Sequence, residues 1–153
     1  MTDPAAPAKT TVELIARAAP PRRAGLDLSD DAIARLVDQF YSDIRDDPRL
    51  GPLFESRLAG QWPEHLRRMN QFWRSVLNHS GEYYGQPVVK HNGLPGLEED
   101  DFRIWIGLFE ATSARLFAPD VAAAILTIAR RIARSLWLAR FGTPFNRSPA
   151  WLD

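Results

Sequence analysis

Residues 62–78, WPEHLRRMNQFWRSVLN, decide the fold class of this 153-residue chain. Large apolar side chains recur there every three or four positions, which is the spacing of one face of an α-helix. Pro63 is compatible with the first turn, where its missing N–H costs nothing. The stretch therefore predicts one amphipathic helix that ends at Asn78. Its expected buried stripe is Trp62, Leu66, Met69, Phe72, Trp73 and Val76.

His65 falls on the same apolar face of this helix. A histidine among tryptophan, methionine and phenylalanine is costly unless its ring nitrogens find partners. It is therefore either a core histidine with satisfied nitrogens or a functional group that faces a bound molecule. The residues alone leave both interpretations open.

Towards the N-terminus, the same spacing predicts a helix that begins after Ser29 and ends at Pro48. Ser29 is a favourable N-cap, and the two aspartates that follow place negative charge in the first turn. Tyr41 lies on the buried stripe, so its hydroxyl needs a partner, either a backbone carbonyl or a bound molecule.

The segment Leu50–Phe54 is then predicted as a tight apolar corner, too short for a normal helix, with Phe54 pointing inward.

Towards the C-terminus, an acidic start at residues 97–101 leads into a predicted helix that ends near Phe117. Its apolar face carries Trp105, whose single N–H donor again needs a partner.

A last helix is predicted from Val121 to about Phe141. Its polar side carries four arginines, most simply a solvated face, or else a surface for an acidic partner. Its expected buried side is Val121, Ala124, Ile125, Ile128, Ile132, Leu136 and Ala139.

Residues 84–96, YGQPVVKHNGLPG, predict a very short helix with stops at both ends. Pro87 suits the first helical position, and the Asn-Gly pair after His91 tolerates a left-handed turn. His91 then lies in the last turn, where a carbonyl without an intrahelical partner can accept its Nδ1–H. That hydrogen bond would leave Nε2 available to a metal. The alternative is a solvated histidine that caps its own helix.

Composition excludes several classes of protein. Lysine plus arginine and aspartate plus glutamate number 19 each, so no net charge favours nucleic acid or an anionic membrane. The lack of cysteine excludes disulfides, zinc–thiolate sites and covalent haem attachment. We see no signal peptide and no apolar window long enough for a membrane span. We expect an all-α, cytoplasmic protein, most simply a monomer.

The chain is expected to divide into three parts. Residues 1–28, rich in alanine and proline, are predicted to be a loosely held extension, partly disordered or a short helix. Residues 29–141 form the helical domain, and residues 142–153 form a turn-rich tail.

An apolar pocket with a solitary histidine suits haem b, because a five-coordinate iron needs one neutral imidazole and a large flat apolar slot. The opposite side of the iron needs donors, and Tyr41, His65 and Trp105 are polar-tipped residues on apolar stripes. Hydrogen bonds to a bound ligand that carries partial charge are worth about 1.5–3 kcal/mol each. The expected pocket residues are Phe40, Phe54, Met69, Phe72 and Trp73.

A set of ordered motifs runs through residues 29–140. They are Phe40-Tyr41, Leu50-Gly51-Pro52-Leu53-Phe54, Trp62-Pro63-Glu64-His65, Phe72-Trp73, Tyr84-Gly85-Gln86-Pro87, Lys90-His91 and Phe102 to Phe109 around Trp105. This set resembles the truncated haemoglobins of group III. The resemblance implies a truncated globin fold over residues 29–141, a two-over-two helical sandwich around haem b. The absence of a Gly-Gly pair agrees, since groups I and II usually carry such motifs.

The resemblance also implies roles for single residues. His91 matches the proximal iron ligand of the family, and Tyr41, His65 and Trp105 match its distal polar residues. Met69 matches a residue of the distal wall. Depending on where His65 lies, the iron would be open, water-bound or coordinated by two histidines.

Two basic residues are candidates for the haem propionates. Arg68 lies one turn beyond His65, and Lys90 precedes His91. The alternative for both is an ordinary solvated side chain. The extension at residues 1–28 is longer than the minimal N-terminus of the family, so its role is open.

Three functions are compatible with these observations. The first is a haem protein that binds O2 and other diatomic ligands (NO, CO, cyanide). The second is a nitric oxide dioxygenase or a peroxidase-like enzyme, which would need an external reductase because the chain has no flavin motif. Strong peroxidase activity is disfavoured, because no carboxylate lies near His91 in the sequence to increase its electron donation. The third is a haem-free helical adaptor whose arginine face binds a partner. We expect the first.

Overall fold

The computed structural model describes residues 27–78 and 94–153, and all regular elements in these ranges are helices. The all-α prediction is therefore confirmed for the described part of the chain. The predictions about residues 1–26 and about the short helix with Lys90 and His91 lie outside the described residues. The elements are α2 (Asp30–Asp46), α3 (Leu50–Leu58), α4 (Trp62–Asn78), α6 (Glu99–Leu116), α7 (Pro119–Phe141) and the 3-10 helix η1 (Ala150–Leu152).

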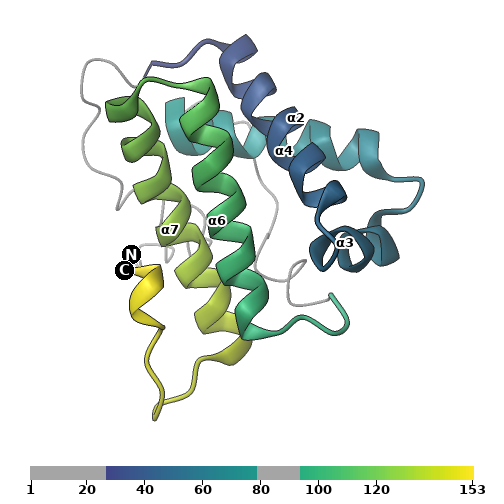
Figure 1. The fold of residues 1–153 in the computed structure, drawn as a ribbon, viewed down its shortest axis with the longest axis vertical. Helices are drawn as coiled ribbons and strands as arrows, with labels where there is room; N and C mark the ends of the chain where they lie inside the picture. The colour runs from purple at the N-terminus through teal and green to yellow at the C-terminus, as the bar shows by residue number, and fades with distance from the viewer. Residues whose placement is uncertain (1–26, 79–93) are drawn as a thin grey trace, which may run out of the picture.

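The long helices form two pairs, one in each of two layers (Figure 1). Helices α6 and α7 run side by side in one layer, and α2 and α4 cross each other in the other. Helix α2 joins the two layers, because it packs against α3, α4 and α6. Within the described ranges, no helix is long and apolar enough to cross a membrane.

Local signals account for α2 and α4. The hydroxyl of Ser29 accepts a hydrogen bond from the backbone N–H of Ala32 at 3.1 Å, as expected of an N-cap. The six large apolar residues of α2 are all buried; they are Ile33, Leu36, Val37, Phe40, Tyr41 and Ile44. Helix α4 has the bounds that the sequence predicted. The Asn78 amide then pairs with both backbone groups of Leu28, which ties the end of α4 to the start of α2.

Helix α3 corrects the prediction of a short corner at residues 50–54. The segment is a nine-residue helix, because Asp47 provides a start signal for it. The Asp47 carboxylate accepts hydrogen bonds from the backbone N–H groups of Arg49 at 2.9 Å and Leu50 at 2.7 Å. Pro48 thus separates two helices. Phe54 points inward as predicted and is 4% exposed.

The buried side of α7 differs in part from the prediction. Ala139 is exposed, so its placement in the core was wrong, while Trp137 is buried. The buried face is wider than a single stripe, because Ala129 and Ala133 are also fully buried. After α7 the tail contains η1, which returns beside α7 and buries Leu152 (Figure 1). The buried residues of α7 are Ala122, Ile125, Ile128, Ala129, Ile132, Ala133, Leu136 and Trp137.

A polar contact joins the two layers near the C-terminal ends of α2 and α6. Thr112 of α6 donates a hydrogen bond to the Asp43 carboxylate of α2 at 2.6 Å, and Arg115 donates to the same oxygen at 2.6 Å. Thr112 is fully buried, and its hydroxyl lies within hydrogen-bond distance of two acceptors, the Asp43 carboxylate and, at 2.8 Å, the Leu108 carbonyl oxygen of its own helix. The contact specifies which face of α6 meets α2.

Gly51 marks the closest approach between α2 and α3. A Cβ at this position would lie 2.5 Å from the Arg45 carbonyl oxygen, which is backbone and cannot turn aside. We expect Gly51→Ala to destabilise the fold by about 1–3 kcal/mol, as other overpacking substitutions do. At Gly107, an exposed helical position with open space, the same change should stabilise by about 0.4–1 kcal/mol. Urea unfolding of both variants checks this, and equal effects would contradict the close approach.

Candidate functional site

A narrow apolar cavity lies between α3, α6, α7 and the loop before α6. Its volume is about 20 Å³. All but one of its lining residues are apolar, and Leu94 and Leu97 continue directly from the segment that carries His91 in the sequence. The lining residues are Leu50, Phe54, Leu94, Leu97, Asp101, Phe102, Trp105 and Leu136.

The predicted pocket residues divide into two sets. Phe54 and Trp105 line the cavity. The others are buried in the same core without lining it; they are Phe40, Met69, Phe72 and Trp73. Sequence periodicity marks a residue as buried but does not distinguish a cavity wall from solid core. For that reason it also missed the aliphatic lining residues.

Tyr41 and His65 lie together at the crossing of α2 and α4. Their ring centroids are 4.9 Å apart with an interplanar angle of 89°, and Tyr41 is 3% exposed. Trp62 packs edge-on against both, at 6.2 Å from Tyr41 and 5.9 Å from His65. We refer to these three residues as the distal cluster. Phe54 packs against Tyr41 at 6.4 Å, so one residue contacts both the cavity and this cluster.

Trp105 reaches the cluster indirectly. Its ring packs edge-on against Phe40 at 5.2 Å, and Phe40 packs against Tyr41 at 5.2 Å. The other face of Trp105 stacks on Phe109 at 5.8 Å, which in turn stacks on Trp73. The structure thus brings together two of the three predicted polar residues and places the third one ring away, on the cavity wall.

Asp101 is the polar residue of the cavity wall and was not predicted as a site residue. It is 2% exposed, and both its oxygens accept hydrogen bonds from Arg49, at 2.8 and 2.9 Å. Arg49 also donates to the Gly96 carbonyl oxygen at 2.8 Å. Arg49 therefore ties the α2–α3 corner to the loop before α6. From the sequence, the acidic residues in 97–101 predicted the start of a helix but gave no sign that Asp101 lines a cavity.

Asp101 also closes the first turn of α6. Its carboxylate accepts a hydrogen bond from the Glu98 backbone N–H at 2.7 Å, as part of a capping box. Burial alone would raise the pKa of Asp101, but the hydrogen bonds from Arg49 and Glu98 outweigh burial and hold the pKa below its ordinary value of 3.8.

This depressed pKa predicts an acid-sensitive contribution to stability. A carboxyl whose pKa is lower in the folded state stabilises the fold above its unfolded pKa, and the stabilisation is lost as pH falls through the folded pKa. We expect Asp101→Asn to lower the free energy of unfolding at pH 7 by about 1–3 kcal/mol. The deficit should shrink below about pH 3.8. The control is Asp100→Asn, an exposed position in the same turn. Urea unfolding at pH 7 and pH 3 is the measurement, and a constant deficit would contradict the assignment.

Arg68, a predicted propionate contact, lies on the exposed side of α4. It forms an ion pair with Glu64 at 3.1 Å, and Arg67 bonds the same carboxylate at 2.6 Å. The hydrogen bond from Arg67 is the main reason that the pKa of Glu64 falls to about 2. The propionate role of Arg68 stays a prediction. In the described part of the chain, no group of three or more His, Asp or Glu side chains is arranged to hold a metal ion.

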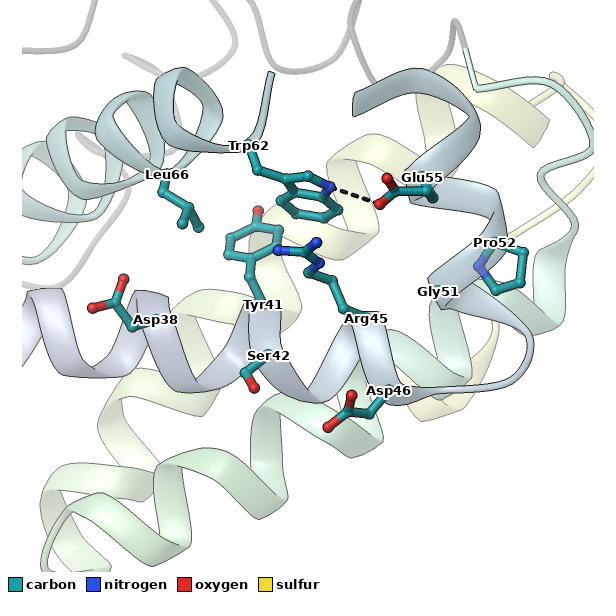
Figure 2. Close-up of a pocket in the computed structure, with 10 residues that line it drawn as sticks. All are labelled: Asp38, Tyr41, Ser42, Arg45, Asp46, Gly51, Pro52, Glu55, Trp62 and Leu66. Atoms are coloured by element: carbon teal, nitrogen blue, oxygen red, sulfur yellow. Dashed lines mark hydrogen bonds between the residues drawn. The ribbon is translucent and has the colours of Figure 1, made fainter. Parts of the chain in front are cut away.

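A second, larger pocket opens on the outer side of the distal cluster (Figure 2). We call it the outer pocket; it has a volume of about 770 Å³ and lies between α2, α3 and α4. Tyr41, Trp62 and Leu66 supply its aromatic and aliphatic surface, and the rest is mostly charged. The sequence offered no signal for it, because its residues come from three helices. It is lined by Asp38, Tyr41, Ser42, Arg45, Asp46, Gly51, Pro52, Glu55, Trp62 and Leu66.

Comparison with known proteins shows the family to which the chain belongs. No protein-family model matches the chain. A curated group 3 truncated hemoglobin from Campylobacter jejuni is 34% identical in an alignment of 109 positions that covers 69% of this chain and 86% of the relative. The crystal structure of group III truncated hemoglobin from Campylobacter jejuni matches with a TM-score of 0.70 and 30% identity, over 78% of this chain and 95% of that chain.

The similarity in sequence and the similarity in structure therefore point to the same family. The predicted truncated globin fold is confirmed, since the chain is all-helical over the described residues and matches a solved truncated hemoglobin over most of the length of both chains. The chain belongs to the group III truncated haemoglobin family.

Proposed function

We propose that this protein binds haem b and, through it, diatomic gases. The observation that carries the proposal is the apolar cavity bordered by Phe54 and Trp105, with Tyr41 packed against Phe54 and His65 packed against Tyr41. Family membership supports it, since the relatives are described as truncated hemoglobins.

The described residues fit a flat apolar cofactor chemically. Seven of the eight lining residues are apolar, and the carboxylate of the eighth, Asp101, is already paired with Arg49. Haem b, when bound, supplies an iron that coordinates a gas molecule. His91 is the residue we propose as its axial ligand. Because the cavity is narrow, binding requires its walls to separate, and the loop residues Leu94 and Leu97 are the part that adjoins the His91 segment.

The chain's own groups then act on the gas ligand. Tyr41 and His65 carry hydrogen-bonding atoms within a buried aromatic cluster, where water competes poorly for them. In such surroundings a hydrogen bond is electrostatically stronger than in water. We propose that these two residues hold the ligand and that Trp105 adds an indole N–H from the cavity wall.

Hemin titration tests the proposal. Purified chain is titrated with hemin, then reduced and exposed to O2 or CO, while the absorption spectrum is recorded. We expect a Soret band that saturates at one haem per chain and shifts when either gas is added. A chain that remains without a Soret band under these conditions rules the function out and leaves the haem-free adaptor.

Trp105→Phe separates the indole N–H from the packing of the ring. The phenylalanine preserves an aromatic contact with Phe40 and Phe109 but removes the donor. We expect the O2 off-rate or the autoxidation rate to rise about 2- to 10-fold, the value of one ordinary hydrogen bond. Stopped-flow kinetics measures this, and unchanged rates would remove Trp105 from the ligand contacts.

Nitric oxide dioxygenation is a further use of the same pocket and needs a separate test. We propose gas binding as the basic activity, with turnover dependent on an external reductase. The oxygenated protein is mixed with nitric oxide and a reductant, and nitrate is followed. Nitrate formed over many cycles indicates an enzyme, whereas one equivalent per haem indicates binding alone.

A further inference from the structure

The distal cluster is held from outside by two charged side chains. The indole N–H of Trp62 donates a hydrogen bond to the Glu55 carboxylate at 2.7 Å. The guanidinium of Arg45 lies over the face of the same ring, 4.5 Å from its centroid. Figure 2 shows this arrangement, with Glu55 on α3, Arg45 on α2 and Trp62 at the start of α4. We call it the Trp62 clamp.

Each part of the clamp restricts a different motion of the indole. A hydrogen bond to a carboxylate is charge-assisted and fixes the direction of the N–H. A cation over the ring face resists tilting, because the attraction depends on the face of the π-system. Trp62 itself is 6% exposed, although Glu55 and Arg45 are exposed. The ring therefore has one defined orientation, set by residues that lie at the surface.

The orientation of Trp62 matters because its edges contact the residues proposed to hold the gas. The interplanar angles are 64° with Tyr41 and 87° with His65, so both contacts are edge-to-face. Edge-to-face pairs have a preferred geometry and are worth energy beyond their buried area. Since Tyr41 and His65 also contact each other, a displaced indole would disturb both rings.

We propose that Trp62 is a positioning residue, and that Glu55 and Arg45 set through it the orientation of the Tyr41–His65 pair towards the bound ligand. The inference rests on the proposed function, because it concerns the distal groups of a haem-bound protein. Arg45 and Glu55 line the outer pocket of about 770 Å³ together with Trp62 and Tyr41, so the clamp lies in the wall between this pocket and the distal pair.

The test uses the haem-loaded protein and the variant Glu55→Ala, which removes the acceptor from an exposed position and should not impair folding. We expect the indole N–H of Trp62 to exchange faster with solvent in nuclear magnetic resonance spectra. The C–O stretching frequency of the carbon monoxide complex should shift in the direction seen in Tyr41→Phe. The O2 off-rate should rise about three- to tenfold. Glu55→Gln, which retains an acceptor oxygen, should restore most of each property.

Glu110→Ala is the matched control. It also removes an exposed carboxylate from a helix, but one on α6 that lines neither the cavity nor the outer pocket. We expect it to leave the C–O frequency and the O2 off-rate unchanged. A shift as large as that of Glu55→Ala would show a general charge effect and overturn the positioning role.

The outcomes separate this inference from the proposed function. If Glu55→Ala speeds the exchange of the Trp62 N–H while the C–O frequency stays constant and Tyr41→Phe shifts it, the positioning role is wrong and the proposed function stands. If Tyr41→Phe also leaves the frequency unchanged, the distal assignment fails together with the inference. If no variant or parent chain shows a Soret band, haem binding itself fails.

Discussion

His91→Ala is expected to abolish stable haem binding. The sequence matches this residue to the proximal iron ligand of the family, and haem b has no covalent attachment in a chain without cysteine. Mutations of residues that merely orient a metal ligand reduce metal affinity by about 10- to 100-fold, so loss of the ligand itself should exceed that range. The Soret band should therefore be absent at equimolar hemin, and added imidazole should restore part of it.

The other two histidines supply the controls for this experiment. His79→Ala removes a histidine that the sequence places in the polar stop after Asn78, and it should leave the spectrum unchanged. His65→Ala removes the histidine of the distal cluster and should preserve the Soret band while it alters ligand kinetics. If His91→Ala binds hemin as tightly as the parent chain and His65→Ala does not, the axial assignment is reversed.

Tyr41→Phe is expected to raise the O2 off-rate about 10- to 100-fold, because a hydrogen bond to a ligand with partial charge is worth about 1.5–3 kcal/mol. The substitution removes one oxygen and keeps the ring. The contacts with Phe40, Phe54, Trp62 and His65 can therefore persist. The effect should exceed that of Trp105→Phe, because Tyr41 is buried while Trp105 is partly exposed, and a hydrogen bond is stronger where water is excluded.

Carbon monoxide provides an internal control for Tyr41. Bound CO carries less negative charge than bound O2, so a lost donor should change the CO off-rate much less. Stopped-flow measurement of both ligands in the same variant makes the comparison. Equal increases for O2 and CO would mean that Tyr41 controls access to the pocket and donates no hydrogen bond to the ligand.

For helices α2 and α4, local sequence patterns were enough to predict the span of each helix. Their N-terminal residues, apolar stripes and stops lie within a few positions of one another, so the sequence predicted both spans and the burial of Tyr41. Helix α3 was missed although its signal is local, because Pro48 was interpreted only as the end of a helix. The Asp47 carboxylate that starts α3 was visible in the sequence.

The candidate site was predictable only as a set of residue types. The resemblance to the family predicted Tyr41, His65 and Trp105 as distal residues, and the structure brings the first two into contact. The pairing of Arg49 with Asp101 was not predictable, since 52 positions separate the two residues. Likewise, nothing near Glu55 in the sequence indicates that its carboxylate holds an indole seven residues away across a turn.

By itself, the sequence determined the all-α class, the spans of four long helices and the family to which the chain belongs. These follow from side-chain spacing and capping, which act over three or four residues, and from motifs in a fixed order. Only the tertiary structure decided that Phe54 borders both the cavity and Tyr41, and that Glu55 and Arg45 hold Trp62 against the distal pair. Such contacts depend on how helices cross, and crossing is set by the packing of whole faces rather than by any local signal.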